Sequence, residues 1–325
     1  MAINLRYFPM EARIMTIRNS KYGKLEENDL LICAMGYEAR SHYLLKQNLA
    51  TRNKFNTLVF CLERHEQDHA IFDEIVKKHI KVVKSKYDGA NDIKEQLTDF
   101  IKNDPPKNEM NIHFDYSSMP RSWYCSFPFM LSEHKQLVND EKPASFWYVS
   151  GDYPEKYTNY PSAGIDSFYV FNGSSLPAVD IKRFHIIGLG YDNVRTETVI
   201  TIIEPESLIS CYAYNPRDSE TLESARKKNK RIIDNSLLSV ALPLDNFSAI
   251  VDKLRELVFN LTQNGQVVFV PDGPKPLIMA MSLVPGIVKK NGITCLHISR
   301  NNSLPNKVDV KPRKDEIYGF QMLLD

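Results

Sequence analysis

The feature that most constrains the fold is a pair of motifs that occurs twice at the same spacing. Gly-Tyr-acid begins at Gly36 and again at Gly190, each time directly after an apolar run. Farther along each half, a second apolar run is followed by proline and a basic residue. The residue before that proline is Met119 in the first half and Gly273 in the second, and it lies equally far from the motif glycine in both. Such self-similarity predicts an internally duplicated structural unit.

The two motifs differ in how specific they are. Gly-Tyr-acid occurs only twice in the chain, whereas proline followed by lysine or arginine occurs five times. Pro120 and Pro274 follow short apolar runs, but Pro106, Pro216 and Pro312 lie in polar stretches. The duplication therefore depends on the order of the motifs and their sequence context as well as on their spacing.

Apolar runs alternate with helix-like segments in both halves, which predicts mostly parallel sheets covered by helices. The fold class we expect is α/β, with two tandem Rossmann-like parallel-sheet units related by internal duplication. Expected strands are 30–35, 57–62, 80–84, 112–116 and 146–150, then 184–189, 208–212, 237–242, 267–270 and 294–298. Expected helices are 41–49, 66–78, 91–102 and 121–133, then 197–203, 219–233, 247–263 and 276–289.

Two domains are the default for 325 residues. We place the first, with its N-terminal extension, at 1–158, a Pro- and Gly-containing linker at 159–182, and the second, with its C-terminal extension, at 183–325. The linker also contains a possible extra edge strand at 167–171. Residues 1–24 and 300–325 lie outside the repeat. They could carry a contact with a partner protein or a second copy, or they could simply cover sheet edges.

Composition excludes several classes of protein. A hydrophobic content of 43% and a charged content of 25% are those of a soluble globular protein. The net charge of +1 does not indicate nucleic-acid binding, and no apolar run is long enough to span a membrane. The five cysteines form no C-x-x-C pair, so we expect buried reduced thiols in a cytoplasmic protein.

The candidate ligand-binding residues lie at or just after the ends of the first and fourth expected strands of each half, where open α/β sheets bind their ligands. In the first half they are Glu38, Arg40, Asp115, Ser117, Ser118 and Arg121, and in the second half Asp192, Arg195, Asp272, Gly273 and Lys275. Neither half has a complete G-x-G-x-x-G or a Walker A loop, so we expect no resident cofactor.

Each group of candidates has a structural alternative. Arg121 and Lys275 fall in a first helical turn, where the macrodipole disfavours cations by about 0.3–1 kcal/mol unless an anion binds there. They could instead form salt bridges to Asp115 or Asp272, or be solvated, and Ser117, Ser118 and Asp272 could cap the helices. Arg40 and Arg195 could clamp phosphate, or they could pair with the acids that precede them.

Other polar or aromatic motifs point to structure more than to chemistry. Tyr148, Tyr153, Tyr157 and Tyr160 could stack on a nucleobase or pack an interface. The run 65–69 matches H-E-x-x-H, but its first histidine follows a strand directly and begins a crossover helix, so we expect a solvated first turn and no metal centre. His113 and His185 lie in expected strands and are expected to be core or hydrogen-bonded residues.

Residues 267–275, an apolar strand followed by Asp-Gly-Pro-Lys, resemble the strand–Gly-Thr-Lys–helix element of CRISPR-associated Rossmann-fold sensor domains. A tandem pair of such units is similar to the SAVED type of sensor, which binds cyclic oligonucleotides in bacterial defence. Pro274 stands where that element has threonine, and Met119-Pro120-Arg121 takes its place in the first half. The resemblance implies that Gly273 and Lys275 contact phosphate.

The function we expect is therefore binding of a phosphorylated, nucleotide-derived small molecule in a cleft between the halves, as a sensor or subunit of a prokaryotic defence system. Such a subunit would need a partner protein or self-association for its output. One alternative is a nucleotide- or nucleoside-processing enzyme with its active site in the first half, where Asp115, Ser117 and Glu38 offer acid–base groups. A second is a non-catalytic interaction scaffold.

Overall fold

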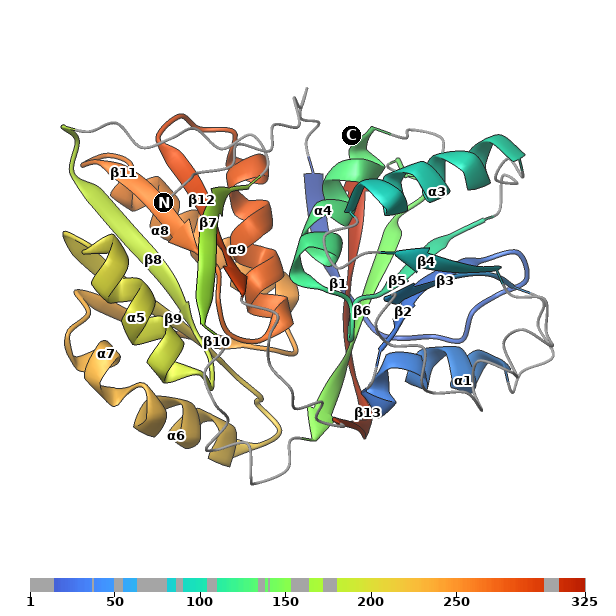
Figure 1. Cartoon of the computed structure of the whole chain (residues 1–325), viewed down its shortest axis with the longest axis horizontal. Helices are drawn as coiled ribbons and strands as arrows, with labels where there is room; N and C mark the ends of the chain where they lie inside the picture. Colours follow the sequence, from blue (N-terminus) through green and yellow to red (C-terminus); the bar gives the residue numbers. More distant parts are fainter. Residues whose placement is uncertain are drawn as a thin grey trace. The chain divides into compact units, whose positions relative to one another are not determined.

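The computed structural model describes residues 15–36, 38–49, 55–62, 81–85, 90–103, 110–133, 138–139, 141–152, 164–171, 180–300 and 310–324. These divide into two compact units. The first unit holds the described residues of 15–152 and 310–324, and the second holds those of 164–300. Each unit is a sheet with helices packed on it (Figure 1).

The sheet of the first unit is parallel except at one edge. Its described strands lie in the order β1-β13-β6-β5-β2-β3-β4. The four pairings from β6 to β4 are parallel, and β13 pairs antiparallel with both β6 and β1. The strands are β1 (Met15–Ser20), β2 (Leu30–Met35), β3 (Asn56–Leu62), β4 (Lys81–Ser85), β5 (Ile112–Asp115), β6 (Ala144–Asp152) and β13 (Lys311–Leu324). The described helices are η1 (Ala39–His42), α1 (Tyr43–Leu49), α3 (Ala90–Asn103) and α4 (Arg121–Ser132).

The sheet of the second unit has the same plan, with described strands in the order β10-β9-β8-β11-β12-β7. All its pairings are parallel except that of β12 with the edge strand β7. The strands are β7 (Ile165–Val170), β8 (Arg183–Leu189), β9 (Ser207–Tyr214), β10 (Leu238–Pro243), β11 (Gln266–Val270) and β12 (Ile293–Arg300). The helices are α5 (Asn193–Ile203), α6 (Ser219–Lys228), α7 (Lys230–Asp234), α8 (Phe247–Leu261) and α9 (Lys275–Val288).

The two sheets correspond strand for strand, which confirms the expected fold class. Numbered within each unit, the parallel strands run third, second, first, fourth, fifth, the order of a Rossmann-type sheet. An antiparallel strand then follows the fifth, β13 in the first unit and β7 in the second. Gly36 and Gly190 both come directly after the first parallel strand, β2 or β8. The two glycines therefore occupy equivalent positions.

Local sequence explains the central strands. Leu30–Met35 is buried at every position, as is all of β8 after Arg183, and such continuous apolar runs suit parallel strands covered on both faces. The cores follow from these runs. Leu31, Cys33 and Val59 share one cluster in the first unit, and Ile187, Val268 and Val270 share one in the second. All five cysteines are buried and free, as expected.

Most of the expected elements are found within a few residues of their predicted ends. Two differ in form, because the helix expected at 41–49 begins with the 3-10 turn η1, and the one expected at 219–233 breaks at Asn229 into α6 and α7. The helix expected at 66–78 and the H-E-x-x-H run lie outside the described residues. The edge strand considered inside the linker is present as β7.

The C-terminal segment departs from the expected domain division. We expected 183–325 to form the second domain, but β13 pairs with β6 and β1 and belongs to the first unit. Phe320 of β13 is fully buried, and its ring stacks on that of Phe146 with centroids 4.7 Å apart. The described parts of both extensions thus complete a sheet edge, which is one of the two roles considered for them.

The two strand histidines are structural, as expected. His113 Nε2 lies 3.3 Å from Asp29 Oδ2, and its Nδ1 accepts a hydrogen bond from Trp147 Nε1 (3.0 Å). His185 is 6% exposed, and burial, with a smaller effect of the nearby Arg183, lowers its pKa to about 4. His185 is therefore a neutral core residue near neutral pH.

If β13 is integral to the first unit, Phe320→Ala should destabilise that unit by about 3–5 kcal/mol, because it removes a buried aromatic side chain. Hydrogen exchange followed by mass spectrometry, resolved by peptide, would show faster exchange in β6 and β5 and unchanged exchange in β8 and β9. Phe259→Ala is the matched control, because this phenylalanine is 64% exposed on α8. Equal effects of both changes, or acceleration confined to the second unit, would contradict the assignment.

Candidate functional site

The candidate residues lie at the carboxyl ends of the first and fourth parallel strands of each unit. These are β2 and β5 in the first unit and β8 and β11 in the second, and each pair is hydrogen-bonded in the sheet. Between these strands the chain order reverses, which makes them the topological switch point where open α/β sheets bind ligands. The fold thus brings the predicted residues of each unit to one sheet edge.

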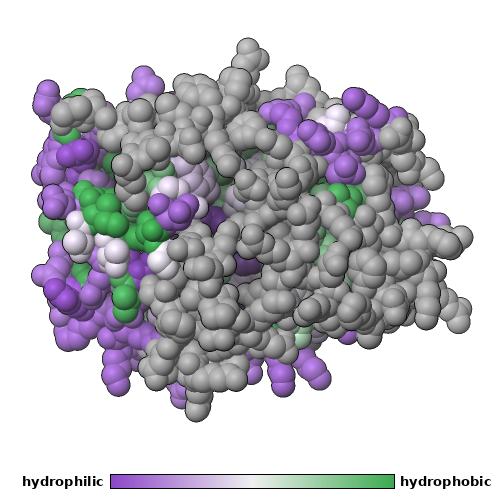
Figure 2. All heavy atoms as spheres, viewed as in Figure 1, coloured by the Kyte–Doolittle hydropathy of each residue, from purple (hydrophilic) through white to green (hydrophobic). Residues whose placement is uncertain are grey.

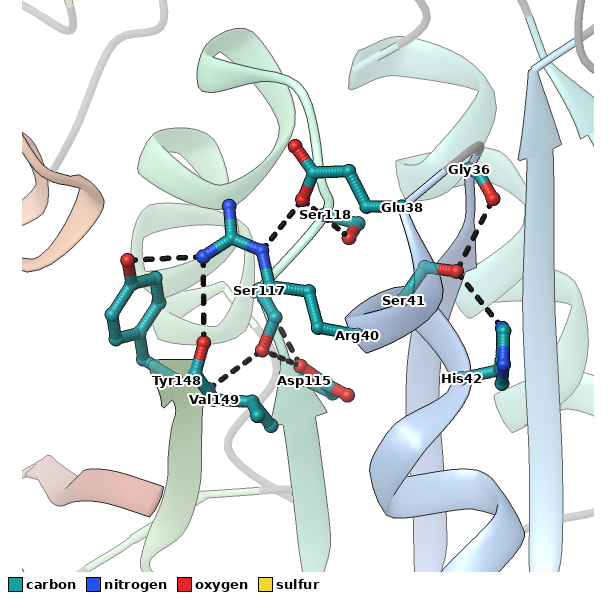
Figure 3. A network of polar contacts seen from close by, with 10 residues as sticks. All are labelled: Gly36, Glu38, Arg40, Ser41, His42, Asp115, Ser117, Ser118, Tyr148 and Val149. Carbon is teal, nitrogen blue, oxygen red and sulfur yellow. Dashed lines mark hydrogen bonds and ion pairs between the residues drawn. The ribbon is translucent and has the colours of Figure 1, made fainter. Parts of the chain in front are cut away.

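In the first unit, Arg40 forms a buried ion pair with Glu38 (Figure 3). Arg40 Nε donates to Glu38 Oε2 over 2.6 Å, and the two side chains are 3% and 16% exposed. Ser118 Oγ donates to the same carboxylate oxygen over 3.3 Å. Figure 3 shows the other oxygen of Glu38 pointing away from Arg40 and Ser118. Glu38 therefore joins the loop after β2 to the loop after β5.

Arg40 also reaches β6, the fifth parallel strand. Its Nη1 donates to Tyr148 Oη (3.1 Å) and to the carbonyl oxygen of Val149 (3.4 Å), and its Cζ lies 5.5 Å from the centre of the Tyr148 ring. The backbone N–H of Arg40 donates to the carbonyl oxygen of Val310, just before β13. Arg40 thus connects the η1 turn to β6 and to the residue that precedes β13. Tyr148 is buried as well, and the other three candidate tyrosines lie outside the described residues.

Asp115 and Ser117 form a second buried network beside this one (Figure 3). Asp115 Oδ1 accepts from Ser117 Oγ (2.5 Å) and from the Ser117 backbone N–H (3.0 Å). Ser117 Oγ in turn accepts from the backbone N–H of Val149 (2.8 Å). Ser117 is fully buried and Asp115 is 1% exposed, so this pair fixes the loop between β5 and α4 and offers no surface to a substrate. Burial, together with the nearby Asp115 carboxylate, raises the pKa of the Cys33 thiol.

In the second unit, Arg195 binds two carboxylates. Its Nη2 donates to both oxygens of Asp272 (2.7 and 2.8 Å), and its Nε donates to Asp272 Oδ2 (3.2 Å). Its Nη1 donates to Asp192 Oδ2 (2.9 Å), and Asp192 Oδ1 caps α5 by accepting from the Arg195 backbone N–H. Arg195 is 6% exposed and Asp272 is 1% exposed. The loops after β8 and β11 are therefore joined by a bidentate, charge-assisted contact.

Glycine lets these two loops pack backbone to backbone in the second unit. A Cβ on Gly188 would lie 2.1 Å from the carbonyl oxygen of Asp272, and one on Gly190 would lie 2.8 Å from Gly273 Cα. Gly273 itself has a φ of +97° and approaches the carbonyl oxygen of Leu189. In the first unit the contact is looser, because a Cβ on Gly36 would meet only the Ser118 Cβ, at 3.8 Å. Larger residues at these second-unit positions would separate the loops.

The helices after the fourth strands, α4 and α9, begin with a cation in both units. Residues 123–131 of α4 and 276–284 of α9 are buried. Arg121 is the only charged residue of α4, Lys275 is the only charged residue of α9, and each is the first residue of its helix. Proline precedes each as the N-cap, and no side chain caps either helix.

The structure decides between several of the sequence alternatives. Arg40 and Arg195 form ion pairs with acids, as the structural alternative held, so their guanidinium groups are already bound by the protein. Ser117, Ser118 and Asp272 do not cap α4 or α9 as the sequence suggested, because their side chains bind other groups and prolines hold the N-cap positions. Arg121 and Lys275 do occupy first turns, as predicted.

The equal spacing of the motifs conceals a difference of one residue. Cys33 of β2 lies opposite Asp115 of β5, and the equivalent Ile187 of β8 lies opposite Val270 of β11. Along the sequence, Asp115 is one residue nearer to Cys33 than Val270 is to Ile187. The loop from β5 to α4, residues 116–120, is correspondingly one residue longer than the loop from β11 to α9, residues 271–274. Counted from the strand ends, Ser117 corresponds to Asp272 rather than to Pro271. Both side chains are buried and form hydrogen bonds that hold their loops against neighbouring segments.

Sequence reasoning missed one segment that reaches this edge. Asn229 Nδ2 donates to the carbonyl oxygen of Gly190 (3.0 Å), and Lys228 Nζ lies 5.1 Å from the centre of the Tyr191 ring. Five of the six residues at 226–231 are basic, a signal visible in the sequence. That this basic segment reaches the loop after β8 depends on the break between α6 and α7, which we did not predict from the sequence.

Two other properties of the described residues bear on function. No group of three or more His, Cys, Asp or Glu side chains among them is placed to hold a metal ion. None of their helices has both the length and the apolar character needed to cross a bilayer.

Comparison with known proteins gives little similarity in sequence. No protein-family model matches the chain, and no curated protein matches it. Among solved structures, the chain is similar to the crystal structure of an N-terminal ketoreductase from a macrolactin assembly line. The identity is 7%, the match covers 86% of this chain and 72% of that one, and the TM-score is 0.25. The assignment of the fold therefore rests on the sheet topology of the two units.

Breaking the Arg195–Asp272 pair should destabilise the second unit strongly. Arg195→Ala leaves the Asp272 carboxylate in a buried position without its arginine, which costs about 3–5 kcal/mol of unfolding free energy. Chemical denaturation would measure the loss. Arg183→Ala is the matched control, because Arg183 pairs with Glu206 at the surface and its removal should leave the unfolding midpoint almost unchanged. Similar midpoints for the two variants would show that the buried pair does not hold the loops together.

Proposed function

We propose that the protein binds a phosphorylated, nucleotide-derived ligand at the switch-point edge of its duplicated Rossmann-like units and acts as a ligand-dependent sensor or regulatory subunit. The observation that carries the proposal is the position of Arg121 and Lys275. Each is the only charged residue of a buried helix, and each is the first residue, where the macrodipole disfavours a cation. A bound anion would turn this unfavourable placement into a favourable one.

The neighbouring charges support an anionic ligand. Arg40 neutralises Glu38, and Arg195 is shared between Asp192 and Asp272, so the buried arginines offset carboxylates that would otherwise repel an anion. Arg121 and Lys275 are partly exposed, in contrast to Arg40 and Arg195. The resemblance of residues 267–275 to the phosphate-contacting element of CRISPR-associated sensor domains is in line with this proposal, and a role in prokaryotic defence is part of it.

Removing either first-turn cation should weaken nucleotide binding. Arg121→Ala and Lys275→Ala should each lose a charge-assisted contact worth about 1.5–3 kcal/mol. Titration calorimetry with a panel of nucleoside mono-, di- and triphosphates would measure the affinity of the full chain. Lys253→Ala on α8 is the control, because Lys253 is partly exposed and pairs with Glu256. Absence of nucleotide binding, or binding that neither change weakens, would contradict the proposal.

The alternative function is a nucleotide- or nucleoside-processing enzyme with its active site in the first unit. The observation that favours it is Glu38, which is held by Arg40 and Ser118 through one oxygen while the other points away from both (Figure 3). A positioned, partly exposed carboxylate could act as a general base. Ser117 is too deeply buried to serve as a nucleophile.

Mass spectrometry of nucleotides and NAD incubated with the protein would separate the two functions. An enzyme would convert one of them, and Glu38→Gln would abolish turnover while Glu95→Gln, an exposed change on α3, would not. The sensor that we propose would return every bound ligand intact. Turnover that depends on Glu38 would therefore replace the sensor by the enzyme, provided that thermal unfolding shows the variant to be folded.

A further inference from the structure

Three segments of the second unit meet at Gly190, the residue that follows its first parallel strand. Gly273 packs against Gly190 backbone to backbone, and Lys275 begins α9 two residues later. Asn229, at the break between α6 and α7, donates from Nδ2 to the carbonyl oxygen of Gly190 (3.0 Å) and to that of Ala225 (3.0 Å). Asn229 is 1% exposed, so this contact is an interior one. Lys228 and Lys275 are therefore both brought to the loop that carries Tyr191.

The basic run at 226–231 is not uniformly free to attract anions. Among the described residues, Arg226, Lys230 and Arg231 form ion pairs with nearby acids, and Lys228 interacts electrostatically with Asp192. Arg226 Nη1 lies 3.6 Å from Glu223 Oε1, and Lys230 Nζ lies 2.6 Å from Asp234 Oδ2. Arg231 Nη1 lies 3.6 Å from Glu197 Oε2. The helix dipole accounts for cations at the end of α6, but it does not require one of them to lie against the switch-point loop.

Lys228 is the member of the run that reaches this loop. Its Nζ lies 5.1 Å from the centre of the Tyr191 ring, within the range of a cation–π contact. Tyr191 is 50% exposed although it follows a strand whose last six residues are buried. Val194, one helical turn on, is 59% exposed. Figure 2 shows hydrophobic residues gathered on the side of the second unit within a mainly hydrophilic surface.

An exposed aromatic ring beside Lys228, on a loop that packs against the segment leading to Lys275, suits a ligand that has a planar base and several phosphates. One face of the Tyr191 ring lies toward Lys228, and a ring has a second face on which a nucleobase can stack. A single phosphate needs one such cation, whereas Lys228 and Lys275 together suit two or more. The acid partners of the other three cations, and a net charge of +1 for the chain, do not favour the extended backbone of a nucleic acid.

We propose that the second unit binds a nucleoside di- or triphosphate, with the base stacked on Tyr191 and the phosphates contacted by Lys228 and Lys275. This rests on the function proposed above and names the class of its ligand. Tyr191 sets the preference for a base, and Lys228 adds to the phosphate contacts made at the start of α9.

Calorimetry of the full chain with ATP, ADP and inorganic tripolyphosphate tests the assignment of each residue. Tyr191→Ser should weaken ATP binding about 5- to 150-fold, the range for loss of one base–aromatic stack, and should leave tripolyphosphate binding unchanged. Tyr191→Phe keeps the ring and should bind ATP like the unaltered protein. Lys228→Gln should weaken ATP and tripolyphosphate alike, and Lys253→Gln should weaken neither.

The outcomes separate this inference from the function on which it rests. If nucleotide binding depends on Arg121 or Lys275 but not on Tyr191 or Lys228, the inference is wrong and the proposed function stands. If the protein binds no nucleotide, both are wrong. Tighter binding of single-stranded RNA than of ATP through these same residues would replace the nucleotide by a polymer. The melting temperature of each variant shows whether weaker binding comes from a lost contact or from unfolding. If Lys228→Gln is unstable, Tyr191→Ser still tests the inference, because Tyr191 is half-exposed and its replacement should not unfold the protein.

Discussion

The structure depends on two buried arginines, one at the switch point of each sheet. A guanidinium group cannot be buried without acceptors for its five N–H donors, and a carboxylate cannot be buried without a partner. Arg40 meets this requirement with Glu38, Tyr148 and a backbone carbonyl, and Arg195 meets it with Asp192 and Asp272. In the second unit this requirement joins the loops after the first and fourth strands directly. In the first unit Glu38 joins them through Ser118.

The same pairing determines the electrostatics of the sheet edges. Because the arginines offset the acids beside them, Glu38 and Asp192 repel an incoming anion less than unpaired carboxylates would. Arg121 and Lys275 are the only charged residues of their helices, so a generally charged surface does not explain them. Their position at the start of each helix is what needs an explanation. A cation in the first turn is unfavourable for the helix alone, and natural sequences tolerate such features most often where a ligand compensates them.

Much of this fold could be predicted from the sequence, and the part that could not has a common cause. Buried parallel strands such as 30–35 are continuous apolar runs, so local composition identifies them, and the repeated glycine motif aligned the two units. The position of β13 depends on pairing with β6, which lies in the first half of the chain, and no local pattern encodes so distant a partner. The one-residue difference between the β2–β5 and β8–β11 registers is likewise a property of pairing.

The candidate site was predicted in its residues but not in its contacts. Sequence order placed Arg195 and Asp272 at the same sheet edge, yet whether the arginine binds that aspartate or an incoming phosphate depends on side-chain directions in three dimensions. Ser117 was a candidate for chemistry because of its residue type. Its residue type does not reveal that it is fully buried and that its hydroxyl accepts a hydrogen bond from the Val149 N–H. The contact of Asn229 with Gly190 required a helix break that periodicity does not reveal.

The most direct test of this account is a crystal structure of the protein with a bound nucleoside triphosphate. Phosphate oxygens should lie within hydrogen-bond distance of Arg121 or Lys275, at the start of α4 or α9, while Arg40 and Arg195 keep their carboxylate partners. Phosphates bound instead by Arg40 or Arg195, with those ion pairs broken, would contradict the central claim that the buried arginines hold the loops and the first-turn cations bind the ligand. So would a nucleotide bound away from both switch points.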